Sequence, residues 1–70
     1  MKYLIVIERT ATGFSAYSPD LDGCVAVGST GGEVENNVRE AIAFHVEGLR
    51  QDGIAVPEPT SYSTYVEIPA

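Results

Sequence analysis

Carboxylates are the side chains in this sequence with the broadest capacity for chemistry. A metal-dependent nuclease needs several of them converging on two metal ions about 3.5–4 Å apart. Glu8 ends an apolar run, Asp20 and Asp22 lie in the segment PDLDG, and Glu67 lies near the end of the chain. No acid lies in the middle of the first apolar run, so a minimal metal-dependent hydrolase is the least favoured interpretation. Asp20 and Asp22 are better explained as turn residues whose exposed carboxylates can contact a partner.

His45 and Cys24 are the only histidine and the only cysteine. Nucleophilic catalysis needs a nucleophile, a base and an orienting group, and no sequence feature assembles these three. We interpret His45 as a packed residue, with a pH-sensitive interface histidine as the alternative. A single cysteine excludes an internal disulfide and a CxxC metal site, and it is typical of a reducing compartment. We therefore predict no catalytic, cofactor-binding or metal-binding residues and a cytoplasmic location.

The charge balance restricts the class of partner. Four Lys and Arg residues against ten Asp and Glu residues give a net charge of −6. This balance disfavours nucleic acid and anionic membranes, both of which are held by Lys and Arg. It favours a basic protein partner. Residues 28–32, GSTGG, lack the lysine of a phosphate-binding loop, so we interpret them as the entry to a helix.

Hydrophobic patterns predict one α+β domain over residues 1–70. Residues 2–8, 14–18 and 24–27 have strand patterns separated by short turns, which predicts an antiparallel meander. Thr30 and Glu33 have capping-box spacing before a helix that extends to about residue 51, and Gly53 is the expected C-terminal cap. The helix has one apolar stripe, formed by Val34, Val38, Ala41, Ile42, His45 and Leu49. Residues 62–68 are a fourth strand, parallel to the first after a right-handed crossover, so the expected sheet order is 3-2-1-4 with the helix on one face.

The first strand is apolar on both faces, although a single helix layer can cover only one. A second subunit would cover the other face. A domain of this size also has too thin a core to be very stable alone. We therefore predict a homodimer or tetramer, with an interface that includes Leu4, Val6, Tyr62 and Tyr65.

Four motifs follow one another along the chain: F-x-A-x-x-P-D-L-x-G-C at residues 14–24, G-x-T at 28–30, Glu40-Ala41 in the helix, and G-x-x-x-P-x-P at 53–59. With these motifs at these distances, the sequence resembles the HicB-like antitoxin family over nearly the whole chain. Asp22 stands where the family often has proline. The resemblance implies a partial RNase H-like fold in the order β-β-β-α-β. It also implies a non-catalytic protein that neutralises a small basic mRNA-cleaving toxin of the HicA type by covering its catalytic face.

The resemblance leaves open which surface holds the toxin and whether this chain has one. Asp20 and Asp22 in the exposed turn are the first choice, and helix residues Glu35, Glu40 and Glu47 are the second. Typical antitoxins of this family continue into a C-terminal DNA-binding module, and the sequence has no such module after residue 70, so we expect no operator binding. The alternative function is an orphan domain that only associates with itself.

Overall fold

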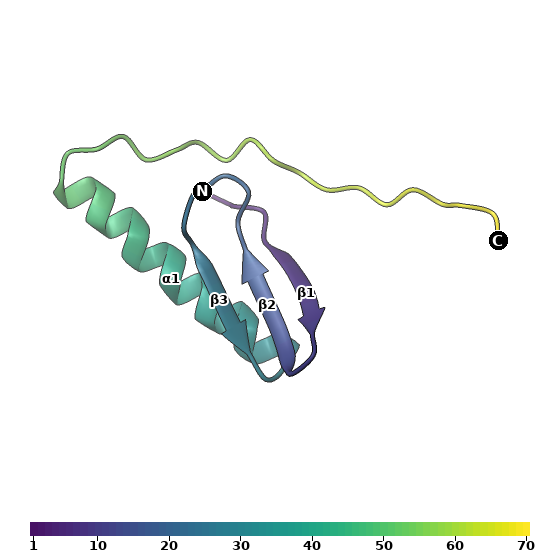
Figure 1. Ribbon diagram of the computed structural model, residues 1–70. Helices are drawn as coiled ribbons and strands as arrows, with labels where there is room; N and C mark the ends of the chain where they lie inside the picture. Colours follow the sequence, from purple (N-terminus) through teal and green to yellow (C-terminus); the bar gives the residue numbers. More distant parts are fainter.

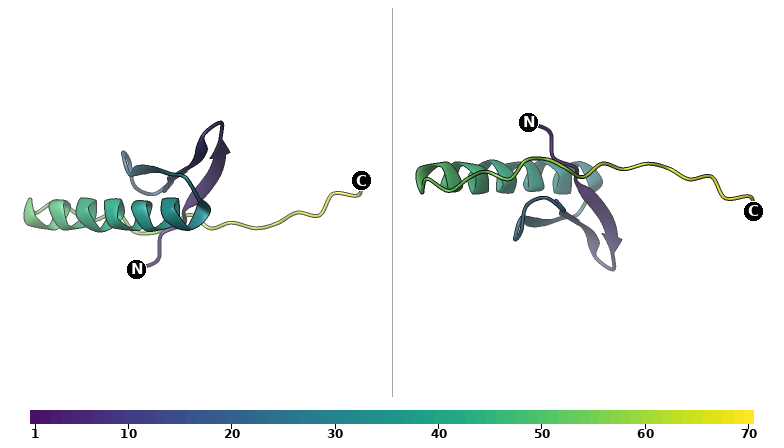
Figure 2. Two further views of the ribbon diagram at one scale, coloured as in Figure 1. Left: turned by 90° about the horizontal axis from the view of Figure 1, so that it is seen from below. Right: turned by 90° about the horizontal axis from the view of Figure 1, so that it is seen from above.

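Three antiparallel strands and one helix form the folded part of the computed structural model, which describes residues 1–70. The strands are β1 (Val6–Thr10), β2 (Gly13–Tyr17) and β3 (Val25–Gly28), and the helix is α1 (Gly31–Gln51). The sheet order is β1-β2-β3, with both pairs antiparallel. The helix lies across one face of the sheet, as Figures 1 and 2 show, and the other face is open. The predicted meander followed by one helix is confirmed.

The core lies between β2 and the helix. Ala16 is fully buried against Val34 and Val38, and the register places Ala16 opposite Ile7 and Ala26 on the helix-facing side. Half-buried apolar side chains surround this cluster, among them Ile5, Phe14, Ala26 and Ile42. The predicted stripe therefore faces the sheet, with its first two valines at the centre of the core.

Both ends of α1 are closed by local hydrogen bonds. The Thr30 hydroxyl accepts a bond from the Glu33 N–H at 3.0 Å, as the capping-box spacing predicts. The Glu33 carboxylate accepts from the N–H of Ser29, at 3.1 Å, one residue before the cap. At the other end the N–H groups of Gly53 and Ile54 donate to the carbonyls of Arg50 and Leu49, which is the bonding pattern of a glycine-terminated helix.

Gly28 allows β3 and α1 to approach closely where the chain enters the helix. A Cβ atom at this position would lie 2.6 Å from the Val34 backbone nitrogen. The glycine-rich segment therefore has a packing role at Gly28, in agreement with the interpretation of residues 28–32 as a helix entry.

β1 begins four residues later than predicted. Val6 pairs with Tyr17, the last residue of β2, and beyond Tyr17 the chain turns away at Pro19. Residues 2–5 consequently have strand-forming side chains and no strand to pair with. β1 is an edge strand here, and its outer edge is unpaired.

The expected fourth strand does not form in this single chain. After Gly53 the chain turns back, crosses the end of the sheet near the N-terminus and continues outward beyond β1 (Figures 1 and 2). We call residues 54–61 the crossing segment. The hydroxyl of Tyr3 donates to the carbonyl of Pro57, which holds this segment in place. The Cα radius of gyration is 13.9 Å, whereas a compact domain of this length has about 11 Å. The difference reflects residues 62–70, which we call the tail.

Candidate functional site

Asp20 is a structural anchor rather than a free carboxylate. It accepts bonds from the N–H and hydroxyl of Thr60, at 3.2 and 3.0 Å, and from the N–H and hydroxyl of Ser61, at 3.1 and 2.9 Å. Oδ2 accepts both backbone N–H bonds and Oδ1 accepts both hydroxyl bonds, so little acceptor capacity remains for a partner. The turn that positions Asp20 is closed by the Leu21 N–H on the Ser18 carbonyl.

The hydrogen bonds at Asp20 change its acidity. Desolvation by burial is the largest single influence and raises the pKa, but the bonds from Ser61 and Thr60 together outweigh it. The pKa of Asp20 is therefore lowered from its ordinary value of 3.8, and the carboxylate is ionised at neutral pH.

The other predicted partner-binding acids occupy different surfaces. Asp22 is exposed in the turn and makes no hydrogen bond within the chain. Glu40 and Glu47 are exposed on the outward face of α1. Glu35 instead lies on the side of the helix next to β1, where it forms an exposed ion pair with Arg39 at 3.9 Å. The three helix carboxylates therefore do not form one acidic face.

Phe44 is a surface residue that the sequence reasoning did not single out. Its side chain is 83% exposed, and Glu40 and Glu47 lie one helical turn before and after it on the same face. The exposure of Phe44 could have been predicted from the sequence, because an aromatic residue outside the apolar stripe of a helix does not face the core. We call Glu40, Phe44 and Glu47 the helix patch.

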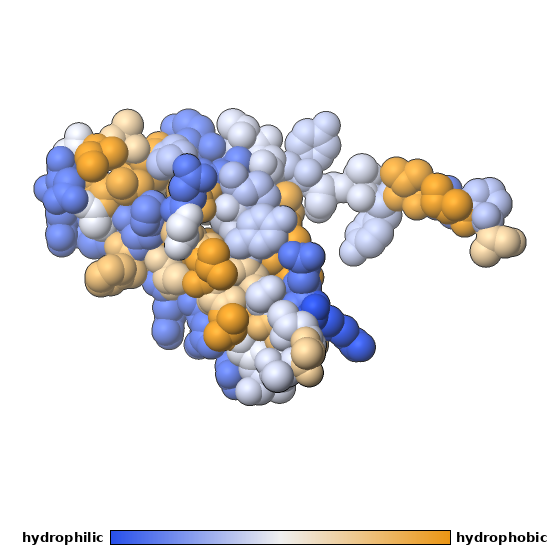
Figure 3. Space-filling view, viewed as in Figure 1, coloured by the Kyte–Doolittle hydropathy of each residue, from blue (hydrophilic) through white to orange (hydrophobic).

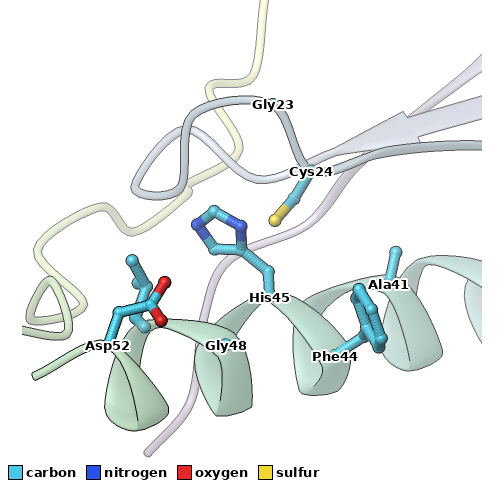
Figure 4. Close-up of a pocket in the computed structure, with 8 residues that line it drawn as sticks. Gly23, Cys24, Ala41, Phe44, His45, Gly48 and Asp52 are labelled. Carbon is cyan, nitrogen blue, oxygen red and sulfur yellow. The ribbon is translucent and has the colours of Figure 1, made fainter. Parts of the chain in front are cut away.

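A hollow of about 440 Å³ separates the turn from the C-terminal half of α1 (Figure 4). Cys24 and His45 both face it, and Phe44 and Asp52 lie at its border. His45 is half-buried, and neither ring nitrogen makes a hydrogen bond within the chain. The histidine on the apolar stripe is thus only partly packed, whereas the sequence led us to expect a packed residue.

Cys24 shares this hollow with His45 but is not arranged as an activated nucleophile. Its side chain is buried, and burial raises the pKa of the thiol above its ordinary value of 9.0. The neutral thiol is the predominant form at neutral pH, whereas a nucleophilic cysteine has a lowered pKa.

The carboxylates of the hydrolase hypothesis are not brought together. No group of three or more His, Cys, Asp or Glu side chains has the arrangement of a metal site. In particular, Asp20 holds the crossing segment while Glu67 extends outward on the tail. No helix of the fold combines the length and the apolar character that crossing a membrane requires.

A second hollow, of about 650 Å³, lies between β1 and α1. Tyr3, Ile5, Ile7 and Ile42 form its apolar lining. The helix lies mainly over β3 and β2 and contacts β1 least, which leaves this space open. We call it the edge hollow.

The predicted self-association residues have different environments. Leu4 and Val6 are half-buried at the start of the first strand, whereas Tyr62 and Tyr65 are almost fully exposed on the tail. Apolar groups also lie on the open face of the sheet over β3, where Figure 3 shows them, and these are Val25 and Val27.

Comparison with known proteins places this arrangement in a family. Residues 3–70 match the family described as the HicB-like antitoxin of bacterial toxin–antitoxin systems. The chain belongs to the HicB-like antitoxin family. The resemblance that its motifs showed is therefore confirmed.

Individual relatives agree with this assignment. A 14.9 kDa protein from the rep-hol intergenic region of Haemophilus phage HP1 is 36% identical over 69 residues, which is 99% of this chain and 52% of the relative. The antitoxin in a solved HicA3–HicB3 toxin–antitoxin complex superposes with a TM-score of 0.71 at 40% identity, covering 84% of this chain and 70% of that one. A crystal structure of antitoxin HicB3 superposes with a TM-score of 0.69 at 42% identity, covering 81% of this chain and 42% of that one. The chain thus spans about half the length of the phage relative and less than half of the chain in the HicB3 crystal structure.

Within this HicB-like domain, the residues that carry the family resemblance have structural roles. Asp20 anchors the crossing segment, Leu21 and Cys24 are buried, and Gly28 and Thr30 form the helix entry. The exposed groups described above lie elsewhere, at Asp22, the helix patch, the open sheet face, the edge hollow and the tail.

Proposed function

We propose that this HicB-like chain is an antitoxin that binds a small basic toxin of the HicA type and neutralises it by covering its catalytic face, without chemistry of its own. The observation that carries the proposal is the likeness to the antitoxin chain of a solved toxin–antitoxin complex. The net charge of −6 supports a basic partner, because opposite charges increase the rate of association.

The helix patch is the surface we assign to the toxin. An exposed aromatic side chain supplies the kind of anchor that dominates many protein interfaces. Glu40 and Glu47 on either side of Phe44 are suited to lysine or arginine side chains on a basic partner. Asp22 lies in the turn on the opposite side of the first hollow and adds a carboxylate there, whereas Asp20 stays with the crossing segment.

The proposal is tested by calorimetric titration with a HicA-type toxin from the genome that encodes this chain. Phe44→Ser should weaken binding at least about tenfold, which corresponds to about 1.4 kcal/mol. Glu40→Gln combined with Glu47→Gln should slow association at low salt and have less effect at high salt. Glu58→Gln is the matched control, because Glu58 is an exposed acid outside the patch.

The outcomes separate the function from the surface. Unchanged affinity in both patch variants would mean that the toxin binds another surface, and Asp22→Asn would then be the next variant to test. Absence of any binding by the unmodified chain would contradict the function.

The proposal also includes self-association into a homodimer or tetramer. A one-layer sheet leaves Tyr17, Val25 and Val27 exposed, and the tail adds further apolar side chains. In the assembled protein, residues 62–68 would supply the fourth strand of a partial RNase H-like sheet.

Because the toxin type cleaves mRNA, we place the action of the complex in the cytoplasm.

An orphan domain that associates only with itself is the second candidate. The exposed valines of the open sheet face favour it, because such a face is covered in most stable domains. This candidate predicts an assembly with no affinity for a HicA-type toxin, which the same titration measures.

A further inference from the structure

The tail has the side chains of a strand but no strand to pair with. Residues 62–68 read YSTYVEI, which is rich in β-branched and aromatic residues. Tyr62, Val66 and Ile68 are 88%, 75% and 75% exposed, and alternation places these three side chains on one face of an extended segment. Figure 3 shows the apolar group near the free end of the tail, well away from the folded part.

The complementary surface lies at the edge of the sheet. The outer edge of β1 is unpaired, and residues 3–5, which continue β1 toward the N-terminus, have no strand partner either. Unpaired backbone N–H and C=O groups along an edge strand are a template for another strand. Residues 3–10 are about as long as residues 62–68, so the edge and the tail match in length.

The edge hollow has the position that the side chains of such an added strand would need. Ile5 and Ile7 line it from the first strand, and Ile42 lines it from α1. A strand placed beside β1 would direct every second side chain into this space. The apolar face of the tail, with Val66 and Ile68, has the matching chemistry.

The tail is directed away from the edge of its own sheet. Asp20 holds both the N–H and the hydroxyl of Ser61, and from this point the chain runs past β1 instead of along it (Figure 2). Reversal onto its own β1 would need a tight turn directly after Ser61. Of the residues that favour such turns, residues 60–68 contain only Ser61 and Ser63, and the Ser61 hydroxyl is already bonded to Asp20.

We propose that residues 62–68 of one chain add as a strand to the free edge of β1 in a second copy and insert Val66 and Ile68 into that copy's edge hollow. The exchange is reciprocal, so two copies form a closed, two-fold symmetric dimer. This inference rests on the self-association included in the proposed function, and it specifies which segment each copy contributes.

The first test measures the mass of the unmodified chain and two tail variants by sedimentation. Val66→Asp places a charge on the inward face and should convert the dimer to a monomer. Ser63→Asp places the same charge on the outward face and should leave the dimer intact. Val66 is exposed in the single chain, so both variants should keep the circular dichroism spectrum of the folded domain.

The second test uses only the unmodified chain, so it does not depend on how a variant folds. A sample mixed from two differently isotope-labelled preparations should give nuclear Overhauser contacts between the Val66 or Ile68 methyls of one copy and the Ile5 or Ile7 methyls of the other. Three results would overturn the exchange: a monomeric chain, a dimer that survives Val66→Asp, or contacts only within one copy. Titration of Val66→Asp with the toxin distinguishes these failures from failure of the proposed function, because the helix patch is distant in sequence from the tail and unaltered.

Discussion

Asp20 illustrates how one carboxylate determines the path of a segment 40 residues later in the chain. Four hydrogen bonds from Thr60 and Ser61 satisfy both of its oxygens. The turn residues Pro19 and Gly23 present this carboxylate at the end of the sheet, where the returning chain crosses. Asp20, which we expected to contact a partner, thus has a role within the domain.

Asp20→Asn should release the crossing segment. An amide nitrogen cannot accept hydrogen bonds, so at least two of the four donors lose their partner. Amide hydrogen exchange at Thr60 and Ser61 should approach the rates of an unstructured chain, while exchange in α1 should stay slow. Asp22→Asn, at an exposed acid with no bond within the chain, is the control. Equal protection of Thr60 and Ser61 in both variants would refute the anchoring role.

The same anchor should respond to acid. The folded-state pKa of Asp20 is lowered, so its contribution to stability is fully present above the ordinary value of 3.8 and is lost as the pH falls through the folded-state pKa. The amide resonances of Thr60 and Ser61 should therefore move toward random-coil positions only below pH 3.8. A midpoint for this movement above 3.8 would mean that the carboxylate is not stabilised in its ionised form.

Gly28 is the second residue whose substitution tests the structure. Gly28→Ala should destabilise the domain by about 1–3 kcal/mol in urea denaturation, because the new methyl group would overlap the Val34 backbone. Gly32→Ala is the matched control, since a Cβ there meets nothing within 4 Å. It should instead stabilise the helix by about 0.4–1 kcal/mol. Similar destabilisation by both changes would contradict the close approach of β3 and α1.

At the scale of elements, the sequence predicted the helix and the strands that are determined by neighbouring residues. The stripe from Val34 to Leu49 and the Thr30–Glu33 spacing predicted the helix, and alternation predicted β2 and β3 to within one residue at each end. β1 was placed too early because its apolar run extends past the point where β2 ends. The position of residues 62–68 depends on contacts with distant parts of the chain or with another copy. Periodicity can assign the strand character of such a segment, but not its partner.

The contacts of individual side chains likewise depend on distant parts of the chain, which sequence patterns do not reveal. The bonds between Asp20 and Ser61 join residues 41 apart, and no spacing rule connects a turn acid with a distant serine. Phe44 could have been recognised, because it interrupts the polar face of an otherwise regular amphipathic helix. Residue types thus indicated which side chains could contact a partner, and the fold determined which of them make contacts within the chain instead.

Thr30→Ala tests the local control of the helix. Loss of the hydroxyl that accepts from the Glu33 N–H should cost about 1 kcal/mol of unfolding free energy. Ser29→Ala is the neighbouring control, because only the backbone of Ser29 takes part in the capping bonds. Chemical denaturation of the two variants compares them directly. If Ser29→Ala destabilises the domain as much as Thr30→Ala, the cap is not the origin of the effect.

At the scale of the whole molecule, the helix patch and the tail lie on separate parts of an elongated chain, with extents of 50 × 27 × 15 Å. A toxin on the outward face of α1 and a second copy on the edge of β1 would therefore engage different elements. If the proposed dimer forms, this separation would leave room for one toxin on each copy.

The most direct test of this account is an RNA-cleavage assay with a HicA-type toxin from the same genome and increasing amounts of the full chain. The account predicts that cleavage stops when the chain reaches one copy per toxin. It also predicts that Phe44→Ser shifts the inhibition curve to higher concentration, whereas Glu58→Gln does not. Undiminished cleavage with excess folded chain would contradict the antitoxin function.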